Sequence, residues 1–474
     1  MNRMKKWMAW IGVWVLIACT PLYVSAKELE LYSTAAVLMD GESGRILYEK
    51  DGQKPLANAS TTKVLTCILI LEQCDLNEEL TISAYAASQP KVRLGVIPGK
   101  TYLVRDLLYS LMLESHNDSA VALAEHVGKR EIPALSEKDE KDFTGEESRL
   151  AVAAFAKLMN EKAALIGCDD SWFITPNGLD QTESVTMPDG SERLMEHHTT
   201  AADLARIMAY AILRSPQREV FLQITRTPEY QFTAGGQWHC LQNHNSFLSM
   251  MDGALSGKTG FTGKAGYCYV GALKREDRYF IVSLLGCGWP NNRGYKWKDT
   301  RELMEYGLEH FRRVDLRSEE ILFPEERLPK LKVQNGCTKV LEEEAFLTLK
   351  VQGRSEPQDC DKGMKSAQHE SDEGMESGQY EGDEGMESGQ PENDVTAILL
   401  RDGECIESVV RISGKVTAPV EAGQILGEIQ YLLEGNVIRT EALVTEKRIP
   451  ARDYPWCVSQ VLRHFFLGTA LNIA

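Results

Sequence analysis

A serine and a lysine lie one helical turn apart in Ser60–Lys63, a spacing that can activate a hydroxyl for nucleophilic attack. A serine hydroxyl reacts poorly at its ordinary pKa and needs a neighbouring base. Because residues i and i+3 share one face of a helix, Lys63 can place its amine beside the Ser60 oxygen. The amine accepts a proton only when it is neutral, and both burial and a second cation lower a lysine pKa. The pair therefore predicts acyl transfer through a covalent serine intermediate.

Two further motifs follow in order, Ser115–Asn117 and Lys258–Gly260. Together with Ser60–Lys63 they form the S-x-x-K, S-x-N and K-T-G set of active-site serine enzymes. A second S-x-x-K, at Ser88–Lys91, we regard as accidental, because Pro90 interrupts the helical turn that would bring its serine and lysine together. The ordered set is far more specific than any one member.

Each motif has a separate expected role. Ser115 relays a proton to the leaving amine, and Asn117 binds the substrate amide and orients Lys63. Lys258 and Thr259 suit a substrate carboxylate, and a glycine next to them lets an extended peptide approach the strand edge. Two backbone N–H groups form an oxyanion hole, worth roughly 3–4 kcal/mol per donor. The candidate catalytic residues are Ser60, Lys63, Ser115 and Asn117; the candidate substrate-binding residues are Lys258, Thr259, Gly260 and Phe261, with the oxyanion donors on Ser60 and Phe261.

The surrounding pattern predicts an α+β domain. The stretch Ser60–Leu71 is apolar on nearly every face after Lys63, so it is expected to be a helix in the middle of the domain. Helices in the middle of the chain with strands at both ends predict an antiparallel sheet covered by helices. Residues 136–147 are interpreted as a charged surface insertion. The other predicted elements are strands at 35–39 and 45–48, helices at 104–113, 118–128, 149–166, 199–213 and 298–312, and a hairpin of strands 266–273 and 279–287.

Short strands dominate after about residue 320 and predict a small β-rich domain. They are expected at 331–333, 345–351, 396–400, 408–412, 424–432 and 437–444. A repeat with a period of 11 residues interrupts them, and residues 353–394 hold 13 acidic and 3 basic side chains. Such a composition cannot bury a core, so 353–393 is predicted to be a disordered loop. Calcium binding by the repeat is the alternative that we favour less.

Both ends of the chain carry apolar segments. Residues 1–26 have the basic start, apolar run and small-residue cleavage site of a signal peptide. A retained N-terminal anchor and lipidation of Cys19 are the alternatives. Tyr454–Ala474 is amphipathic and suits a helix lying on a membrane surface, or else one packed on the β-rich domain. The predicted organisation is a signal peptide at 1–26, a catalytic domain at 27–318, a β-rich domain at 319–449 and a membrane anchor at 450–474.

Composition excludes several kinds of partner. The net charge of −17 argues against a nucleic-acid ligand. No C-x-x-C or Cys/His cluster stands in the sequence, so we expect neither a metal nor a cofactor. The 11 cysteines show no disulfide-like spacing, and most are expected to be free thiols.

The chain resembles the low-molecular-weight penicillin-binding proteins that act as D-alanyl-D-alanine carboxypeptidases. Besides the three motifs, the resemblance rests on segments 59–66, 106–108, 117–120, 175–180 and 258–262, and it spans about residues 30–310. It implies a β-lactamase/transpeptidase-like fold with a helical subdomain, and Ser60 as the residue acylated by peptidoglycan stem peptides and by β-lactam antibiotics. It also implies an exported enzyme held on the outer face of the cytoplasmic membrane by its C-terminal helix. His116 departs from the glycine that many relatives have.

Other functions fit parts of the pattern. A serine β-lactamase shares the three motifs but needs a second base, and no convincing E-x-x-L-N stands between the second and third motifs. A catalytically silent wall-binding protein has no need of the complete set. A transpeptidase differs only in its product. A basic residue after the catalytic strands often assists carboxylate binding in relatives, and Lys296 and Arg293 are both open for that role.

Overall fold

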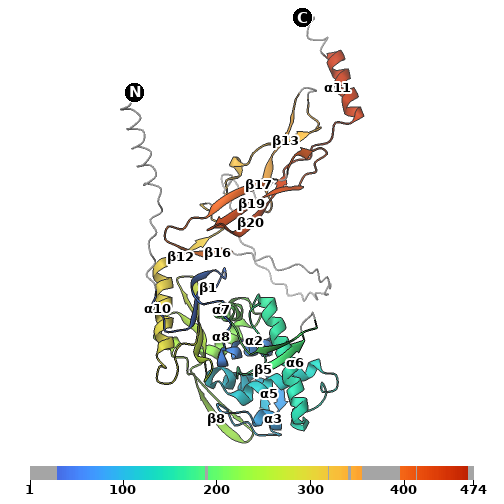
Figure 1. Cartoon of the computed structure of the whole chain (residues 1–474). Helices are drawn as coiled ribbons and strands as arrows, with labels where there is room; N and C mark the ends of the chain where they lie inside the picture. The colour runs from blue at the N-terminus through green and yellow to red at the C-terminus, as the bar shows by residue number, and fades with distance from the viewer. Residues whose placement is uncertain are drawn as a thin grey trace, which may run out of the picture. The chain divides into compact units, whose positions relative to one another are not determined.

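The computed structural model describes residues 29–186, 190–318, 320–339, 343–354, 396–412 and 414–467. The predicted signal peptide and nearly all of the predicted disordered loop lie outside the described residues. Contacts divide the chain into two compact units (Figure 1). The first contains the chain up to Leu38, Tyr48–Leu273 and Ile281–Tyr306; the second contains Met39–Leu47, Lys274–Phe280 and the chain from Gly307. The domain boundary placed after residue 318 stays a prediction.

A five-stranded sheet brings together the two ends of the catalytic region. Its strand order is β2-β1-β11-β10-β9, so the first two strands lie beside the last three. Every residue of β1 is buried, and all of them except Asp40 are apolar. The strands are β1 Ala35–Asp40, β2 Ile46–Lys50, β9 Ala254–Thr262, β10 Gly266–Arg275 and β11 Arg278–Leu285. This arrangement confirms the predicted sheet, with β9 at one edge.

A buried helix, α2, lies in the middle of the first unit. α2 (Lys63–Gln73) follows a 3₁₀ turn at Ala59–Thr62, and its residues 63–71 are all buried. The all-round apolar pattern therefore predicted its position correctly. The helices around it are α3 Ala84–Ala87, α4 Val104–Tyr109, α5 Asn117–Gly128, α6 Gly145–Ile166, α7 Ala201–Ala209, α8 Arg218–Arg226, α9 Phe247–Met250 and α10 Tyr295–His310.

Several elements were not predicted. α3, α8 and α9 are among them, and so are six strands that form three two-stranded sheets. These strands are β3 Glu79–Thr81 with β4 Thr101–Leu103, β5 Thr182–Thr186 with β6 Glu192–Glu196, and β7 Glu229–Ala234 with β8 Gln237–Gln242.

The interpretation of residues 136–147 as a solvated insertion was wrong in part. Glu140 and Phe143 are buried, and Phe143 packs with Leu135 and Ala151 in a small apolar cluster. Glu140 accepts hydrogen bonds from His126 and contacts the Lys129 amine. The segment thus contributes buried contacts as well as surface.

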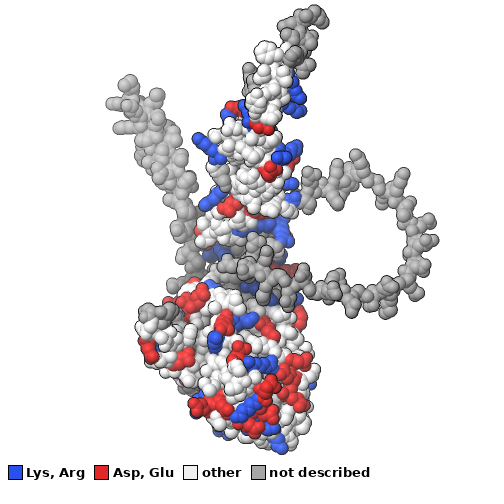
Figure 2. Space-filling model, turned by 90° about the vertical axis from the view of Figure 1, so that its right-hand side faces the viewer, with Lys and Arg blue, Asp and Glu red and all other residues white. Residues whose placement is uncertain are grey.

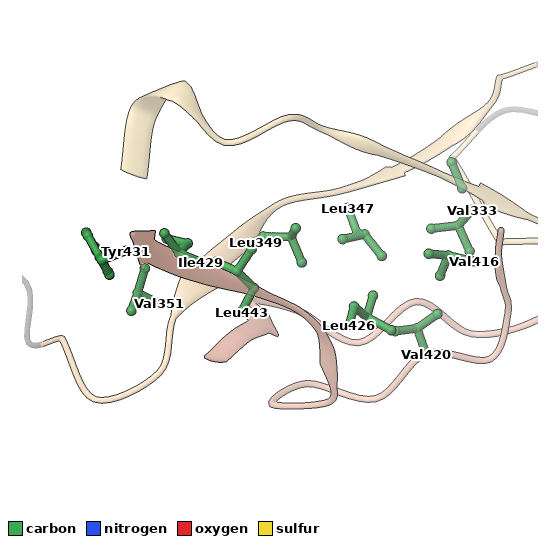
Figure 3. Packing of buried hydrophobic residues seen from close by; sticks show 11 residues of the cluster. Val333, Leu347, Leu349, Val351, Val416, Val420, Leu426, Ile429, Tyr431 and Leu443 are labelled. Carbon is green, nitrogen blue, oxygen red and sulfur yellow. The ribbon is translucent and has the colours of Figure 1, made fainter. Parts of the chain in front are cut away.

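The second unit is β-rich, as predicted. Its sheets have the orders β15-β20-β19-β17, β14-β13-β18 and β12-β16. An apolar core runs between them, with Tyr431 and Val351 at one end and Val333 and Val416 at the other (Figure 3). The strands are β12 Phe311–Asp315, β13 Leu331–Gln334, β14 Ala345–Leu347, β15 Leu349–Val351, β16 Ala397–Arg401, β17 Glu407–Ile412, β18 Val416–Thr417, β19 Ile425–Leu433 and β20 Asn436–Thr445.

The described chain ends in α11 (Tyr454–Leu467). Within the described part of the chain, no helix has the length and apolar character needed to cross a membrane. The cysteines described, nine in number, are all free thiols, in line with the expectation drawn from their spacing.

Candidate active site

The Lys63 amine lies at the centre of the predicted site. It is fully buried at the start of α2 and donates to Ser60 Oγ at 2.9 Å, Asn117 Oδ1 at 2.9 Å and the Asn177 main-chain oxygen at 2.8 Å. Ser60 lies in the 3₁₀ turn just before α2, so the i and i+3 spacing holds across the junction. The structure brings the first two motifs together around one nitrogen.

Burial and a second positive charge depress the Lys63 pKa. Burial is the larger cause, and the nearby Lys258 ammonium acts in the same direction. The Asp118 carboxylate opposes them, yet the pKa remains well below its ordinary value. A neutral amine in hydrogen-bond contact with Ser60 Oγ can accept the serine proton.

The backbone before and at Ser115 sets the position of the second motif. A π-helical turn at Ser110–Glu114 continues α4, and Ser115 then takes a left-handed conformation with φ of 66°. Asn117 follows as the first residue of α5. Its side chain accepts from Lys63 through Oδ1 and donates to the Pro90 oxygen at 3.2 Å through Nδ2. These contacts fix the orientation of the amide.

Lys258 connects the third motif to the second. Its buried amine donates to Ser115 Oγ at 2.9 Å and to the Thr259 main-chain oxygen at 2.9 Å. Burial lowers the pKa of Lys258 to about 7. The ammonium form places a positive charge directly against Ser115 Oγ.

Gly260 and Gly178 allow two other segments to approach the 3₁₀ turn Ala59–Thr62, which contains Ser60. A Cβ on Gly260 of β9 would lie 2.9 Å from Ser60 N, 3.0 Å from Asn58 O and 3.0 Å from Thr61 N. A Cβ on Gly178, which has φ of +80°, would lie 1.9 Å from the Ala59 oxygen. Both neighbours are main-chain atoms, which cannot rotate away. The K-T-G glycine thus lets an edge strand approach the serine N–H group.

A cleft of about 530 Å³ opens beside these groups. All three motifs reach its wall, and the Phe261 side chain stands 42% exposed at its edge. Both cations considered for carboxylate binding, Arg293 and Lys296, also line it. The lining residues from the motifs are Ser60, Ser115, Asn117, Thr259, Gly260 and Phe261.

His116 is packed into the protein. Its Nδ1 lies 2.8 Å from Ser110 Oγ, and burial lowers its pKa to about 4. The accidental motif is also clear of the chemistry, because the exposed Ser88 hydroxyl donates to the Tyr85 oxygen of its own helix turn. Lys91 does reach the cleft wall, without Ser88.

Two supporting residues were not singled out from the sequence. The Asn177 main-chain oxygen accepts from Lys63, as described above. His197 is buried with Nε2 2.9 Å from Thr62 Oγ1, and its Nδ1 accepts from the Ile174 N–H at 3.0 Å. Burial lowers its pKa to about 3, so the neutral ring joins the nucleophile turn to the segment that holds Asn177. No sequence signal could have found His197, since it lies 135 residues from Thr62.

Comparisons with known families agree with this geometry. A family model described as D-alanyl-D-alanine carboxypeptidase matches residues 23–131 and 151–287. A second one, described as the C-terminal domain of penicillin-binding protein 5, matches residues 374–451. The gap in the first match contains residues 136–147, the segment expected to be an insertion.

Individual relatives are similar over much of the chain. D-alanyl-D-alanine carboxypeptidase DacF of Bacillus subtilis is 25% identical over 421 residues, covering 87% of this chain and 84% of that protein. D-alanyl-D-alanine carboxypeptidase DacB2 of Mycobacterium tuberculosis is 31% identical over 273 residues, covering 57% and 81%. Two matched relatives, from Pseudomonas aeruginosa and Escherichia coli, are named D-alanyl-D-alanine endopeptidase instead and cover 51% and 54% of this chain.

The fold agrees with a solved structure over nearly its whole length. D-alanyl-D-alanine carboxypeptidase DacD of Francisella tularensis superposes with a TM-score of 0.58 at 19% identity, covering 92% of this chain and 98% of that one. The similarity includes both the α+β unit and the β-rich unit.

Proposed function

The chain belongs to the D-alanyl-D-alanine carboxypeptidase family, and from this premise we propose that it removes the terminal D-Ala from peptidoglycan stem pentapeptides through an acyl-enzyme on Ser60. The observation that carries the assignment is the buried Lys63 amine, which contacts Ser60 Oγ and Asn117 Oδ1 at once. A role as the base accounts for a buried lysine that has no carboxylate among these contacts, because an unpaired buried charge is costly.

Acylation begins at the penultimate D-Ala carbonyl. Ser60 Oγ forms a bond to the carbonyl carbon as its proton moves to the neutral Lys63 amine. The N–H groups of Ser60 and Phe261 stabilise the oxyanion, each donor contributing roughly 3–4 kcal/mol. The short distance between Gly260 and Ser60 N supports placing the two donors on either side of one small pocket.

The amide bond then breaks and the leaving D-Ala amine takes up a proton. Ser115 is the donor that the contacts favour, since it accepts from Lys258 and lines the cleft. Lys258 replaces the proton that Ser115 gives up. Lys63 then gives up the proton that it took from Ser60, and this proton restores the Lys258 ammonium. Water attacks the ester carbon, the neutral Lys63 amine takes a proton from the water, and that proton passes to Ser60 Oγ as the ester bond breaks.

The free carboxylate of the substrate needs a cation. Thr259, Arg293 and Lys296 line the cleft, and the buried Lys258 lies behind Thr259 and Ser115. Lys296 packs over the rings of Tyr267 and Trp297, with its amine 4.8 Å from each centroid, and donates to the Arg293 main-chain oxygen. This packing holds Lys296 in place, so we favour Lys258 and Thr259 for the carboxylate and Arg293 as the more adaptable helper.

Carboxypeptidase action is favoured over endopeptidase action by the relatives that match most of the chain. Two relatives, from Bacillus subtilis and Escherichia coli, cover 87% and 88% of this chain and are named carboxypeptidase, whereas the two endopeptidases cover 51% and 54%. The test is product analysis with a synthetic stem pentapeptide and with a purified crosslinked stem dimer. Release of D-Ala from the pentapeptide with the dimer left intact is the expected result. Cleavage of the dimer with no free D-Ala, or transfer to an added amine acceptor, would contradict it.

Penicillins are expected to acylate Ser60, and the penicilloyl ester is expected to be hydrolysed slowly. A β-lactamase requires a base that activates water against the penicilloyl ester, and the sequence offers no glutamate motif for this. Labelled penicillin should therefore remain bound to the protein for many minutes on a gel. Rapid and sustained nitrocefin turnover would instead favour the β-lactamase assignment.

Attachment to the outer face of the cytoplasmic membrane is proposed from the two ends of the chain. The signal-like residues 1–26 support export. In α11 the apolar side chains of Val461, Leu462 and Phe465 are 47%, 50% and 69% exposed, whereas Gln460 on the other face is 8% exposed. Most side chains visible on this end helix are neither acidic nor basic (Figure 2). A helix with an open apolar face suits the interfacial region of a bilayer.

A further inference from the structure

Three side chains with metal-binding atoms meet at the end of α2 farther from the cleft. Cys74, Glu78 and His126 each offer one ligand atom, and these atoms all lie within 4.8 Å of one another. We propose that Cys74, Glu78 and His126 bind a zinc ion, with His126 oriented by the carboxylate of Glu140.

The ligands come from elements that already hold one another. Cys74 directly follows α2 and its N–H donates to the Ile70 oxygen at 2.9 Å. Glu78 stands just before β3, and His126 lies in the last turn of α5. α2 begins at Lys63 and α5 begins at Asn117, so the proposed ion would join the far ends of the two helices whose first residues meet in the candidate active site.

Hydrogen bonds hold the His126 ring between two carboxylates. Its Nδ1 lies 2.6 Å from Glu140 Oε1, a carboxylate oxygen that can only accept, so Nδ1 carries a proton. Nε2 lies 2.8 Å from Glu78 Oε1, which also only accepts, and a metal ion bound there would displace the Nε2 proton. A carboxylate that binds the second ring nitrogen of a histidine is the usual support for a zinc ligand.

A positive charge already lies beside His126 Nε2 and Glu78. In the structure the Arg130 guanidinium supplies it, with one nitrogen 3.1 Å from His126 Nε2 and in contact with Glu78. The Arg130 side chain is 34% exposed and can turn toward solvent. The guanidinium also interacts with the Cys74 thiol, so it occupies the position between all three ligand atoms that a divalent cation would take.

The donor set selects the metal. A thiolate, an imidazole and a carboxylate together favour zinc over calcium and magnesium, which prefer oxygen ligands. Three protein ligands leave one tetrahedral position for water. No pattern in the sequence indicates this site, because His126 lies 48 residues from Glu78 and the packing of α5 against α2 brings them together.

Cobalt is the direct probe, since it replaces zinc and absorbs light when a thiolate binds it. Full-length protein stripped with a chelator is titrated with Co²⁺ and then with Zn²⁺. We expect one cobalt per chain, a thiolate-to-cobalt charge-transfer band, and loss of that band when zinc is added. The Cys74→Ser variant should lose the band. The Cys240→Ser variant, which changes an exposed thiol elsewhere, should keep it.

Two more variants keep the test decisive if Cys74→Ser folds poorly. Glu140→Gln should weaken zinc binding about 10–100-fold by removing the carboxylate behind His126. Arg130→Gln should strengthen it by removing the competing cation. A protein that binds no cobalt, a band that survives Cys74→Ser, or weaker binding in Arg130→Gln would each overturn the proposal and leave the cluster as an ion-pair network. None of these readouts depends on peptidase activity.

Discussion

At the scale of single residues, the site depends on two buried lysines with different tasks. Lys63 contacts Ser60, the proposed nucleophile, and burial together with the charge of Lys258 lowers its pKa. Lys258 contacts Ser115 instead, and burial lowers its pKa to about 7. We propose that the lowered pKa suits Lys63 to act as a base, and that Lys258 acts as a cation or an acid.

The pKa of Lys258 predicts how substrate binding depends on pH. A lowered lysine pKa means that the ammonium is present below about pH 7 and is lost as the pH rises through that value. The KM for a stem pentapeptide should therefore increase above neutral pH, because the substrate carboxylate loses its cation. Steady-state kinetics between about pH 6 and 9 measures this.

The matched variant is Lys258→Arg, since arginine stays charged over this whole range. Its activity should be lower, because the side chain is longer, but its KM should change little with pH. A wild-type KM that is flat across the range would show that Lys258 does not carry the carboxylate. A steep rise in both proteins would point to another titrating group.

At the scale of elements, the site exists because an edge strand lies directly against a helix start. β9 carries the third motif past the 3₁₀ turn that carries Ser60, and only a glycine at position 260 permits the approach. The π-helical turn before Ser115 directs the second motif into the same space. The proposed chemistry thus depends on the backbone as well as on the side chains. The features concerned are the 3₁₀ turn with Ser60, the close approach of β9 and the π-helical turn before Ser115.

Replacing Gly260 tests the strand approach. Gly260→Ala should lower the free energy of unfolding by about 1–3 kcal/mol, because the new methyl group meets main-chain atoms at 2.9–3.0 Å. It should also slow acylation by penicillin, because β9 must move away from Ser60. Gly263→Ala is the control, since a Cβ there meets nothing within 4 Å. Equal stability and equal acylation rates in the two variants would contradict the packing argument.

The sequence predicted the elements with strong local patterns. α2 is apolar at nearly every position, and β10 and β11 are long apolar runs, so local pattern was sufficient. β5 (Thr182–Thr186) has alternating exposed and half-buried residues with no apolar face, and α8 buries only Phe221, Ile224 and Thr225. Such elements are set by tertiary contacts, which a single sequence does not display.

Site prediction followed the same rule. The three motifs contain the side chains that contact one another in the structure: Lys63 contacts Ser60 and Asn117, and Lys258 contacts Ser115. The roles of the Asn177 main-chain oxygen and the His197 ring could not be predicted from the sequence. Every residue has a main-chain oxygen, so residue type does not indicate which one accepts from Lys63, and His197 lies 135 residues from its partner Thr62. The buried part of residues 136–147 was missed for a related reason, since charged residues there are paired with partners distant in sequence.

At the scale of the whole molecule, the chain combines a catalytic unit with a β-rich unit that ends in an amphipathic helix. The β-rich unit has its own apolar core, so it does not need the catalytic unit to bury its strands (Figure 3). The first turn of α11 is held to this unit by the Trp456 indole, which donates to the Thr338 oxygen at 3.3 Å. The apolar side chains further along the helix stay exposed, which favours a surface outside the protein.

Removing α11 tests the proposed attachment. A mature protein that ends at residue 453 should lose binding to sedimented lipid vesicles while keeping its activity on a soluble pentapeptide. The double variant Val461→Ser with Phe465→Ser should act in the same way, because it removes exposed apolar area without shortening the chain. Undiminished vesicle binding by both proteins would show that the membrane contact lies elsewhere.

The most direct test of the account is to identify the residue that becomes acylated. The full-length protein, Ser60→Ala, Lys63→Ala and Ser88→Ala are each incubated with labelled penicillin, digested and analysed by mass spectrometry, and each is assayed for D-Ala release. We expect the label on the Ser60 peptide in the parent and in Ser88→Ala, none in Ser60→Ala, and acylation at least about 100-fold slower in Lys63→Ala. A label that persists in Ser60→Ala, or unchanged rates in Lys63→Ala, would contradict the assignment of nucleophile and base.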